Sequence, residues 1–306
     1  MSLDKEINTS TVEKKHGLIV KGVGGAYTIL IAPEVMVQAK PRGVFRKRHI
    51  TPTIGDYCDI VDSGDPDIPY SIVEINKRKN VLIRPTVANL DVLVIILSVK
   101  DPEPDFTLLD KLLIVCANKN IRPVIWLNKI DLDADNAIRI EEEYSKGGFE
   151  IIKTSHHESI PEGTLHEIFS GHMVAFAGQS GVGKSTLCNA ITGERDNMEV
   201  GKISERLHRG KHTTRHAEIF SFQDGFLIDT PGFSSLDLAD IGLNEDDVIY
   251  GYPELLHMNE PCRFSDCHHM GELGCAIEHV DISERRLARY RDFMTILIEK
   301  SKHYSK

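Results

Sequence analysis

The sequence has 306 residues, a formal net charge of −10 and 41% hydrophobic residues, which is typical of a globular protein of two or three domains. Its longest apolar run, from Val92 to Val99, has the length of a strand and excludes a membrane-spanning helix. The N-terminus has no apolar signal region, so we expect a cytoplasmic protein without a membrane partner. Because the chain is acidic, any contact with nucleic acid must come from local basic patches.

The N-terminal region is predicted to be a polar, flexible tail (1–15) followed by an all-β barrel of the OB type (16–84). Short β-like runs broken by turns predict the barrel, and no helical pattern interrupts them. The expected strands are His16–Lys21, Ala26–Ala32, Val35–Ala39, Tyr57–Val61 and Ser71–Ile75.

From 85 to 237 the pattern changes to strands that alternate with helices, which is typical of a doubly wound α/β domain. The fully apolar run Asp91–Val99 predicts a strand of the parallel kind. Further strands are expected at Arg122–Leu127, Phe149–Lys153, Met173–Ala177, Ala217–Phe222 and Phe226–Ile228, and helices at Asp105–Asn118, Ala134–Lys146 and Pro161–Phe169.

The C-terminal region, 238–306, is predicted to be a mainly helical module. Its last helix is expected at Ile282–Lys300, with Ser283 in a capping position. Cys262, Cys267 and Cys275 lie close together among histidines, a grouping that favours a metal site over a disulfide.

A phosphate-binding loop of the form GxxxxGK[ST] follows the strand expected at Met173–Ala177 and precedes a helix. Its glycines allow backbone N–H groups to point at phosphate oxygens, while Lys184 reaches the β- and γ-phosphates and Ser185 binds Mg²⁺. The predicted nucleotide-binding residues of this loop are Gly178, Gln179, Ser180, Gly181, Val182, Gly183, Lys184, Ser185 and Thr186.

Two downstream segments complete a phosphate and magnesium site. Asp229, at the end of an apolar strand, can reach Mg²⁺ through water, and Gly232 can donate a backbone N–H to the γ-phosphate. In the loop between the phosphate loop and Asp229, Thr214 is expected to bind Mg²⁺ when GTP is present, with Thr213 as the neighbour that could substitute.

A base-recognition element, Asn128-Lys129-Ile130-Asp131, follows the strand Arg122–Leu127. It matches the NKxD motif of GTPases, in which the carboxylate accepts two hydrogen bonds that guanine donates and adenine cannot. Lys129 is expected to pack along the base, and Ser155 to contact it from the loop after the next strand. Since this motif precedes the phosphate loop by about fifty residues, the sequence predicts a GTPase with its motifs in permuted order.

Five motifs in this order make the chain similar to the ribosome small subunit-dependent GTPase A (RsgA) family: NKID, GQSGVGKST, RGKHTTRH, IDTPGF, and CRFSDCHHMGELGC with ISERR. The resemblance covers nearly the whole chain. It implies an OB barrel, a circularly permuted GTPase and a zinc module. It also implies GTP hydrolysis stimulated by the small (30S) ribosomal subunit, whose late maturation the family assists.

The resemblance places one structural zinc ion on Cys262, Cys267, His269 and Cys275. Three thiolates and one imidazole suffice for a closed tetrahedral site, although His268 or His257 could compete as the fourth ligand. Phe233 stands where Ras-type enzymes carry a water-positioning Gln, so His212 is the family-like candidate for that task, alongside Lys184 and Thr214 as catalytic residues.

Contacts with rRNA are expected on the basic segment Lys40–Arg48 and on the last helix through Arg285, Arg286, Arg289 and Arg291. The loop after Ser155 departs from the family pattern, which leaves its base contacts open. A passive RNA-binding assembly factor and a metabolic P-loop enzyme such as a kinase are the alternatives, and intact Lys184, Ser185 and Asp229 favour hydrolysis. The sequence shows no obvious dimerisation element, so we expect a monomer.

Overall fold

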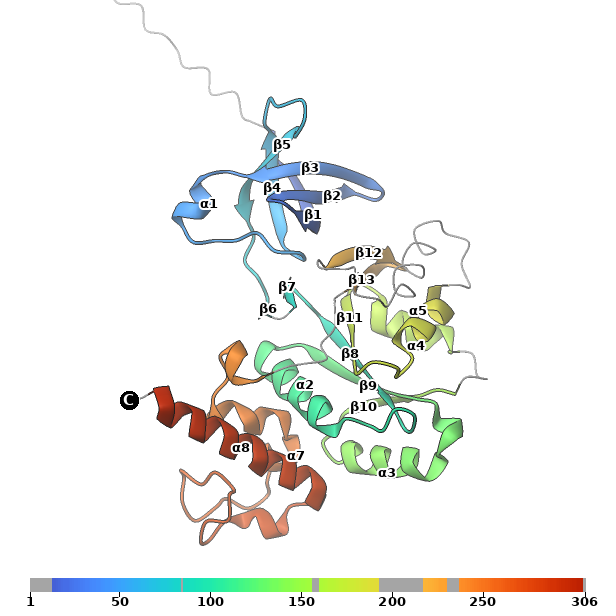
Figure 1. The fold of residues 1–306 in the computed structure, drawn as a ribbon, viewed down its shortest axis with the longest axis vertical. Coiled ribbons are helices and arrows are strands. Elements are labelled where there is room, and N and C mark those ends of the chain that lie inside the picture. The colour runs from blue at the N-terminus through green and yellow to red at the C-terminus, as the bar shows by residue number, and fades with distance from the viewer. Residues whose placement is uncertain (1–12, 84, 156–159, 193–216, 230–236, 305–306) are drawn as a thin grey trace, which may run out of the picture. The chain divides into compact units, whose positions relative to one another are not determined.

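A computed structural model describes residues 13–83, 85–155, 160–192, 217–229 and 237–304. The chain divides into two compact units, one up to Arg78 and one from Lys79 to the C-terminus (Figure 1). Among the described residues, no helix is both long enough and apolar enough to cross a membrane.

The first unit is a closed five-stranded barrel, and all five predicted strands are confirmed. The strands are β1 (Lys15–Val23), β2 (Ala26–Ala32), β3 (Val35–Pro41), β4 (Tyr57–Asp62) and β5 (Tyr70–Ile75). They pair in the order β1-β2-β3-β5-β4, and β4 closes the barrel on β1. Alternate side chains, among them Ile19, Ile29, Ile60 and Ile72, fill the interior, as the two-residue period of a strand requires.

A short helix, α1 (Val44–Lys47), lies between β3 and β4 of the barrel and was not predicted. Phe45 anchors it in the barrel core, while the basic side chains around it are exposed: Lys40, Arg42, Arg46, Lys47 and Arg48. The predicted basic patch therefore lies on the solvent side of this unit.

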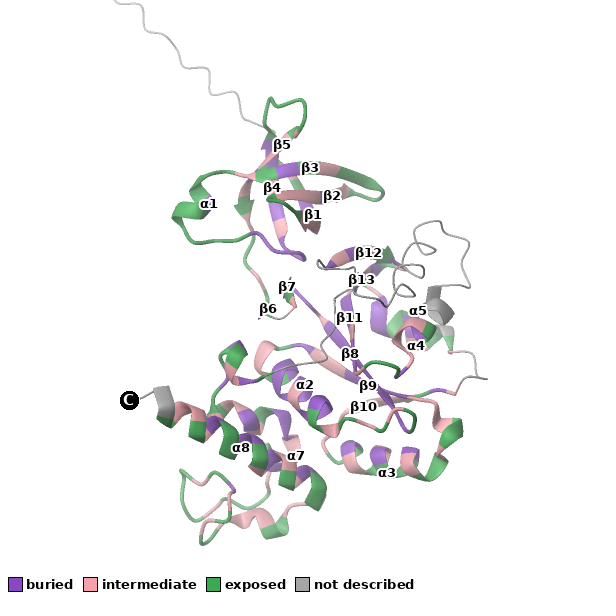
Figure 2. Cartoon of the chain, in the orientation of Figure 1, coloured by how far each residue is buried: buried purple, intermediate pink, exposed green. Residues whose placement is uncertain are grey.

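In the part of the chain that the structure describes, the second unit is built on six paired strands. Its strands are β8 (Val92–Ser98), β9 (Arg122–Asn128), β10 (Glu150–Lys153), β11 (Met173–Ala177), β12 (Glu218–Phe222) and β13 (Gly225–Asp229). The order is β10-β9-β8-β11-β13-β12, with only β12 antiparallel to its neighbour. All seven residues of β8 are buried (Figure 2), which confirms the parallel central strand expected from its apolar run.

The helices of this unit are α2 (Phe106–Lys119), α3 (Ala134–Ser145), α4 (Glu162–Phe169), α5 (Lys184–Thr192), α7 (Pro253–Leu256) and α8 (Glu284–Tyr304). Short 3₁₀ turns accompany them: η1 (Ile130–Leu132), η2 (Ala239–Ile241), η3 (Glu245–Gly251) and η4 (Ala276–His279). The predicted helical segments are confirmed, and the Ser283 hydroxyl caps α8 by accepting from the backbone N–H of Arg286 at 3.1 Å.

A two-stranded hairpin of β6 (Val81–Ile83) and β7 (Thr86–Ala88) opens the second unit and was not predicted. Asn80 stabilises its base, since its side chain donates to Leu90 O at 2.8 Å and accepts from Leu90 N at 3.0 Å. Each strand has three residues, which is too short for a period to appear in the sequence.

Candidate nucleotide and metal sites

The phosphate loop and the NKID motif leave the same edge of the sheet. Strands β9, β8 and β11 are parallel neighbours, with Ser98 opposite Asn128 and Ile95 opposite Ala177. Because parallel strands present their carboxyl ends at one edge, segments about fifty residues apart in the sequence become neighbours. β13 lies on the other side of β11 in the same direction and ends at Asp229.

The phosphate loop has the backbone that its glycines predict. Gly178 and Gly183 have φ values of 140° and 99°, in the region that favours glycine. A Cβ at Gly178 would overlap Ile96 O, and one at Gly183 would overlap Asn128 Nδ2. A side chain at Gly178 would therefore collide with the backbone of β8, and one at Gly183 would displace the Asn128 amide.

Lys184 begins α5, and its ammonium lies inside the curve of the loop. Its Nζ donates to Gly178 O at 2.7 Å and to Gln179 O at 2.6 Å. Burial lowers the pKa of Lys184 below its ordinary value. A partly buried cation at a helix N-terminus is suited to binding phosphate oxygens. Ser185 follows in the first turn of α5.

The NKID motif is hydrogen-bonded to the phosphate loop. Asn128 Nδ2 donates to Val182 O at 2.9 Å, and Lys129 Nζ donates to Gly181 O at 3.0 Å. Lys129 also donates to Asp101 O. Asp131 lies in η1 with its side chain exposed, where an incoming base can reach the carboxylate. Ser155 follows Thr154 beside this motif, since Ile130 N donates to Thr154 O at 3.2 Å.

The four predicted zinc ligands come together at one point. Their ligand atoms all lie within 4.8 Å of one another. His269 Nδ1 lies 3.4 Å from Cys275 Sγ, 3.6 Å from Cys262 Sγ and 3.8 Å from Cys267 Sγ. A zinc tetrahedron with ordinary bond lengths has edges of roughly 3.6–3.8 Å between such atoms. The site therefore fits one zinc ion with no open position, and His269, not His257 or His268, is the histidine in the group.

Several predicted site residues lie outside the described residues: His212, Thr213, Thr214, Gly232 and Phe233. Of Asp229 only the backbone is described. The catalytic and magnesium roles predicted for these positions stay predictions.

Comparisons with known proteins match most of the chain. Residues 75–239 match the family model described as RsgA GTPase, and residues 16–65 match the RsgA N-terminal domain. The chain is 45% identical over 282 residues to the small ribosomal subunit biogenesis GTPase RsgA of Ruminiclostridium cellulolyticum, covering 90% of this chain and 91% of that protein.

The chain belongs to the RsgA GTPase family.

Further RsgA relatives and solved structures extend the match to almost the full length. The Bacillus subtilis (strain 168) RsgA is 36% identical, with 94% of this chain and 99% of that protein covered. The crystal structure of YloQ, a circularly permuted GTPase, superposes with a TM-score of 0.75 at 30% identity, covering 94% and 96% of the two chains. YjeQ from Thermotoga maritima has the same TM-score at 29% identity, with 94% and 99% covered. The permuted order predicted from the motifs is thus confirmed as that of an RsgA-type GTPase.

Thr154 is a site residue that the sequence reasoning missed. Its hydroxyl accepts from the Nε1–H of buried Trp126 at 2.8 Å and donates to Asn128 Oδ1 at 3.2 Å. This chain of bonds fixes the Asn128 amide, whose other end holds Val182. The sequence gives one signal for this role. A residue with a hydroxyl group directly follows the strand expected at Phe149–Lys153 and precedes Ser155.

Replacing Thr154 with valine should lower the free energy of unfolding by about 1–3 kcal/mol, because the buried Trp126 N–H loses its acceptor. Guanine-nucleotide affinity should fall as well, since Asn128 loses a bond that orients it. Urea unfolding and nucleotide titration measure the two effects. Thr107→Val, at an exposed position on α2, is the matched control and should change stability by less than about 0.5 kcal/mol. An unchanged unfolding curve for Thr154→Val would contradict this role.

Proposed function

We propose that this protein hydrolyses GTP in the cytoplasm on the small ribosomal subunit and assists the late maturation of that subunit. The observation that carries the proposal is that Asn128 and Lys129 donate hydrogen bonds to the phosphate loop, at the backbone oxygens of Val182 and Gly181. A guanine-reading motif bonded to a phosphate loop is needed for GTP and serves no purpose in a kinase that uses ATP. The relatives named small ribosomal subunit biogenesis GTPase support the subunit as partner.

In the proposed reaction, Lys184 stabilises the negative charge on the transferred phosphoryl group, and His212 orients the attacking water. Mg²⁺ would be held by Ser185, Thr214 and, through water, Asp229. This ion supplies charge neutralisation on the β- and γ-phosphates. We assign the Cys/His site a structural zinc, because all four positions of a tetrahedron are taken by protein atoms.

For the contact with rRNA we propose the exposed basic side chains around α1, since phosphate contacts require cations that reach solvent. The same role predicted for the last helix is wrong for Arg286, whose side chain is 0% exposed. Arg289 is 14% exposed and paired with two carboxylates, Asp110 and Glu143. Arg285 is exposed and stays in the proposed surface.

The test is phosphate release from GTP and from ATP, each with and without purified small ribosomal subunits. We expect slow GTP turnover that rises by about 10²-fold or more with subunits, because in the proposed reaction the subunit positions the group that orients the attacking water. ATP should stay inert in both conditions. Equal turnover of ATP and GTP would point to a metabolic P-loop enzyme. GTP turnover that is the same with and without subunits would contradict the small subunit as the partner.

A further inference from the structure

A cluster of charged and phenolic side chains is buried where α2 packs on the C-terminal part of the second unit. Its members are Asp110, Glu143, Tyr144, Tyr252, Glu254, Arg286 and Arg289. The side chains of Asp110 and Arg286 are 0% exposed, and that of Glu254 is 2% exposed. None of these residues belongs to the nucleotide or metal sites described above.

Asp110 is the centre of the cluster, and both of its carboxylate oxygens are fully engaged. Oδ1 accepts from Arg286 Nη1 at 2.6 Å and from the Tyr144 hydroxyl at 2.8 Å. Oδ2 accepts from Arg289 Nε at 2.5 Å and from the Tyr252 hydroxyl at 3.2 Å. A buried carboxylate with this many directed partners tolerates one arrangement of α2 against α8, since any shift leaves charges unpaired.

The two arginines are fixed from their other sides too. Arg286 Nε donates to Glu254 Oε1 at 2.6 Å, and its guanidinium lies 4.4 Å from the Tyr252 ring centroid and 4.8 Å from that of Tyr144. Arg289 Nη2 donates to Glu143 Oε1 at 2.6 Å. Burial alone would lower the pKa of Arg289, but the charge of Asp110 holds that pKa above its ordinary value, so the guanidinium stays charged.

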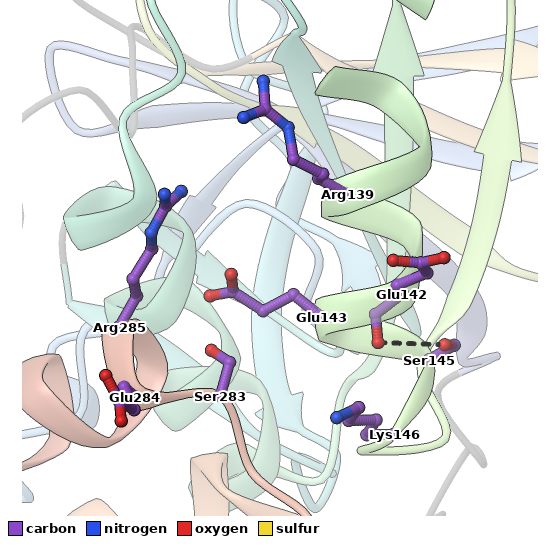
Figure 3. A pocket seen from close by; sticks show the side chains of 8 residues that line it. All are labelled: Arg139, Glu142, Glu143, Ser145, Lys146, Ser283, Glu284 and Arg285. Atoms are coloured by element: carbon purple, nitrogen blue, oxygen red, sulfur yellow. Dashed lines mark hydrogen bonds between the residues drawn. The ribbon is translucent and has the colours of Figure 1, made fainter. Parts of the chain in front are cut away.

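Glu143 forms the solvent edge of this cluster. Figure 3 shows it extending from α3 toward Ser283 at the start of α8. A groove of about 600 Å³ opens there, lined by three basic and three acidic side chains together with two serines. Asp110 itself is closed to solvent, because its side chain is fully buried and bonded to Arg289 and Tyr144.

The N-terminal end of α2 is attached to the phosphate loop. Gln179 Nε2 donates to Glu103 O at 2.9 Å, and Gln179 Oε1 accepts from Asp105 N at 2.9 Å. Asp105 caps α2, since its Oδ1 accepts from Leu108 N at 2.9 Å. Both ends of the Gln179 amide are thus used to hold the first turn of α2 against the phosphate loop.

Between these two attachments most of α2 is buried, although Thr107 and Ala117 are exposed. The helix packs on β8 and β9 and also on η3. A Cβ at Gly251 of η3 would clash with the backbone of Ile114, and Asn118 Nδ2 donates to Asp247 O at 2.9 Å. A helix enclosed in this way moves as a rigid body or not at all.

α8 is also attached to the metal-ligand segment, Cys262 to Cys275. The Tyr290 hydroxyl donates to His268 O at 3.0 Å, and Arg291 Nε donates to His269 O at 3.3 Å. Contacts therefore run without a break from the metal-ligand segment through α8 and Asp110 to α2, and from there through Gln179 to the phosphate loop.

We propose that Asp110 is a positioning residue for GTP hydrolysis. It fastens α8 to α2, so that subunit contact with α8, where Arg285 is exposed, is transmitted through α2 and Gln179 to the phosphate loop. This inference rests on the proposed function, because it needs a subunit that stimulates hydrolysis.

The experiment measures GTP turnover and subunit affinity of the full chain for the wild type and for Asp110→Asn. Asparagine has the same shape but loses the charge that holds both arginines. We expect the subunit-stimulated kcat to fall by about 10-fold or more, the range of coupling between two sites. Turnover without subunits should change by less than about twofold, since Asp110 does not touch the nucleotide site, and the dissociation constant for the subunit by less than about threefold. Asp292→Asn makes the same change at an exposed position on α8 and should leave all three values as in the wild type.

A double-mutant cycle with Gln179→Ala tests the path itself. If both residues act on one path, the double variant should have the stimulated kcat of the weaker single variant, whereas independent effects would multiply. Multiplying effects would overturn the inference. So would full stimulation of Asp110→Asn, or a loss explained entirely by weaker subunit binding. Should Asp110→Asn fail to fold by circular dichroism, Arg289→Lys, which keeps the charge but loses the two-sided bridge, takes its place in the same assays. A wild type that subunits do not stimulate would instead refute the proposed function.

Discussion

Replacing Asp131 with asparagine should lower the affinity for GTP by about 10³-fold or more, because a site built to hydrogen-bond a substrate loses most of its discrimination when one partner is changed. The carboxylate accepts from both N1–H and the exocyclic amine of guanine. Asparagine offers one carbonyl oxygen, and its NH₂ group faces a second donor. Direct titration with GTP and GDP by calorimetry measures the loss.

The same variant should gain affinity for xanthosine triphosphate, since xanthine carries a carbonyl where guanine carries the amine, and the asparagine NH₂ can donate to it. Asp133→Asn is the matched control. Asp133 caps α3, its side chain accepting from Asn136 N at 3.0 Å, and asparagine is an equally good cap. That control should bind GTP as the wild type does. If Asp131→Asn also bound GTP unchanged, another group would have to read the base.

The features that sequence reasoning predicted correctly are those whose cause is local. A phosphate loop needs its glycines wherever it occurs, and Gly178 and Gly183 have the backbone angles that the motif implies. The apolar run of β8 could only be a strand buried on both faces. The meeting of NKID with the phosphate loop followed from the parallel sheet, although the bonds from Asn128 and Lys129 that join them could not be read from spacing.

The features that sequence reasoning missed depend on partners far away in the chain. In the sequence, Asp110 occupies a helical position that is typical of a solvent-exposed carboxylate, and its partner Arg286 lies 176 positions later. Arg286 was therefore assigned to an RNA-facing surface, the ordinary place for an arginine on a charged helix. For a similar reason, the sequence did not decide which histidine completes the metal site. His269 has a φ of 58°, and this left-handed turn belongs to the folded segment and not to its composition.

The second prediction with a large expected effect concerns removal of zinc from the metal-ligand segment. Its side chains between Cys262 and Cys275 are exposed or half-buried, except that of His269, which is buried. So little buried apolar surface cannot order the segment, whereas a structural zinc site of this kind contributes about 10–16 kcal/mol. Chelation of zinc, or Cys275→Ser, should therefore unfold this segment locally.

We expect about one zinc ion per chain in the wild type and a sharp loss of bound zinc in Cys275→Ser, measured by elemental analysis. Hydrogen exchange should then rise between Cys262 and Cys275 and along the part of α8 whose Tyr290 hydroxyl bonds His268 O. Nucleotide binding should persist, because the phosphate loop is held by β11, α2 and NKID. Cys116→Ala is the matched control, since this thiol is buried in α2 away from the metal group, and it should keep its zinc. Full zinc content in Cys275→Ser would remove that residue from the ligand set, and unchanged exchange after chelation would show that the segment folds without metal.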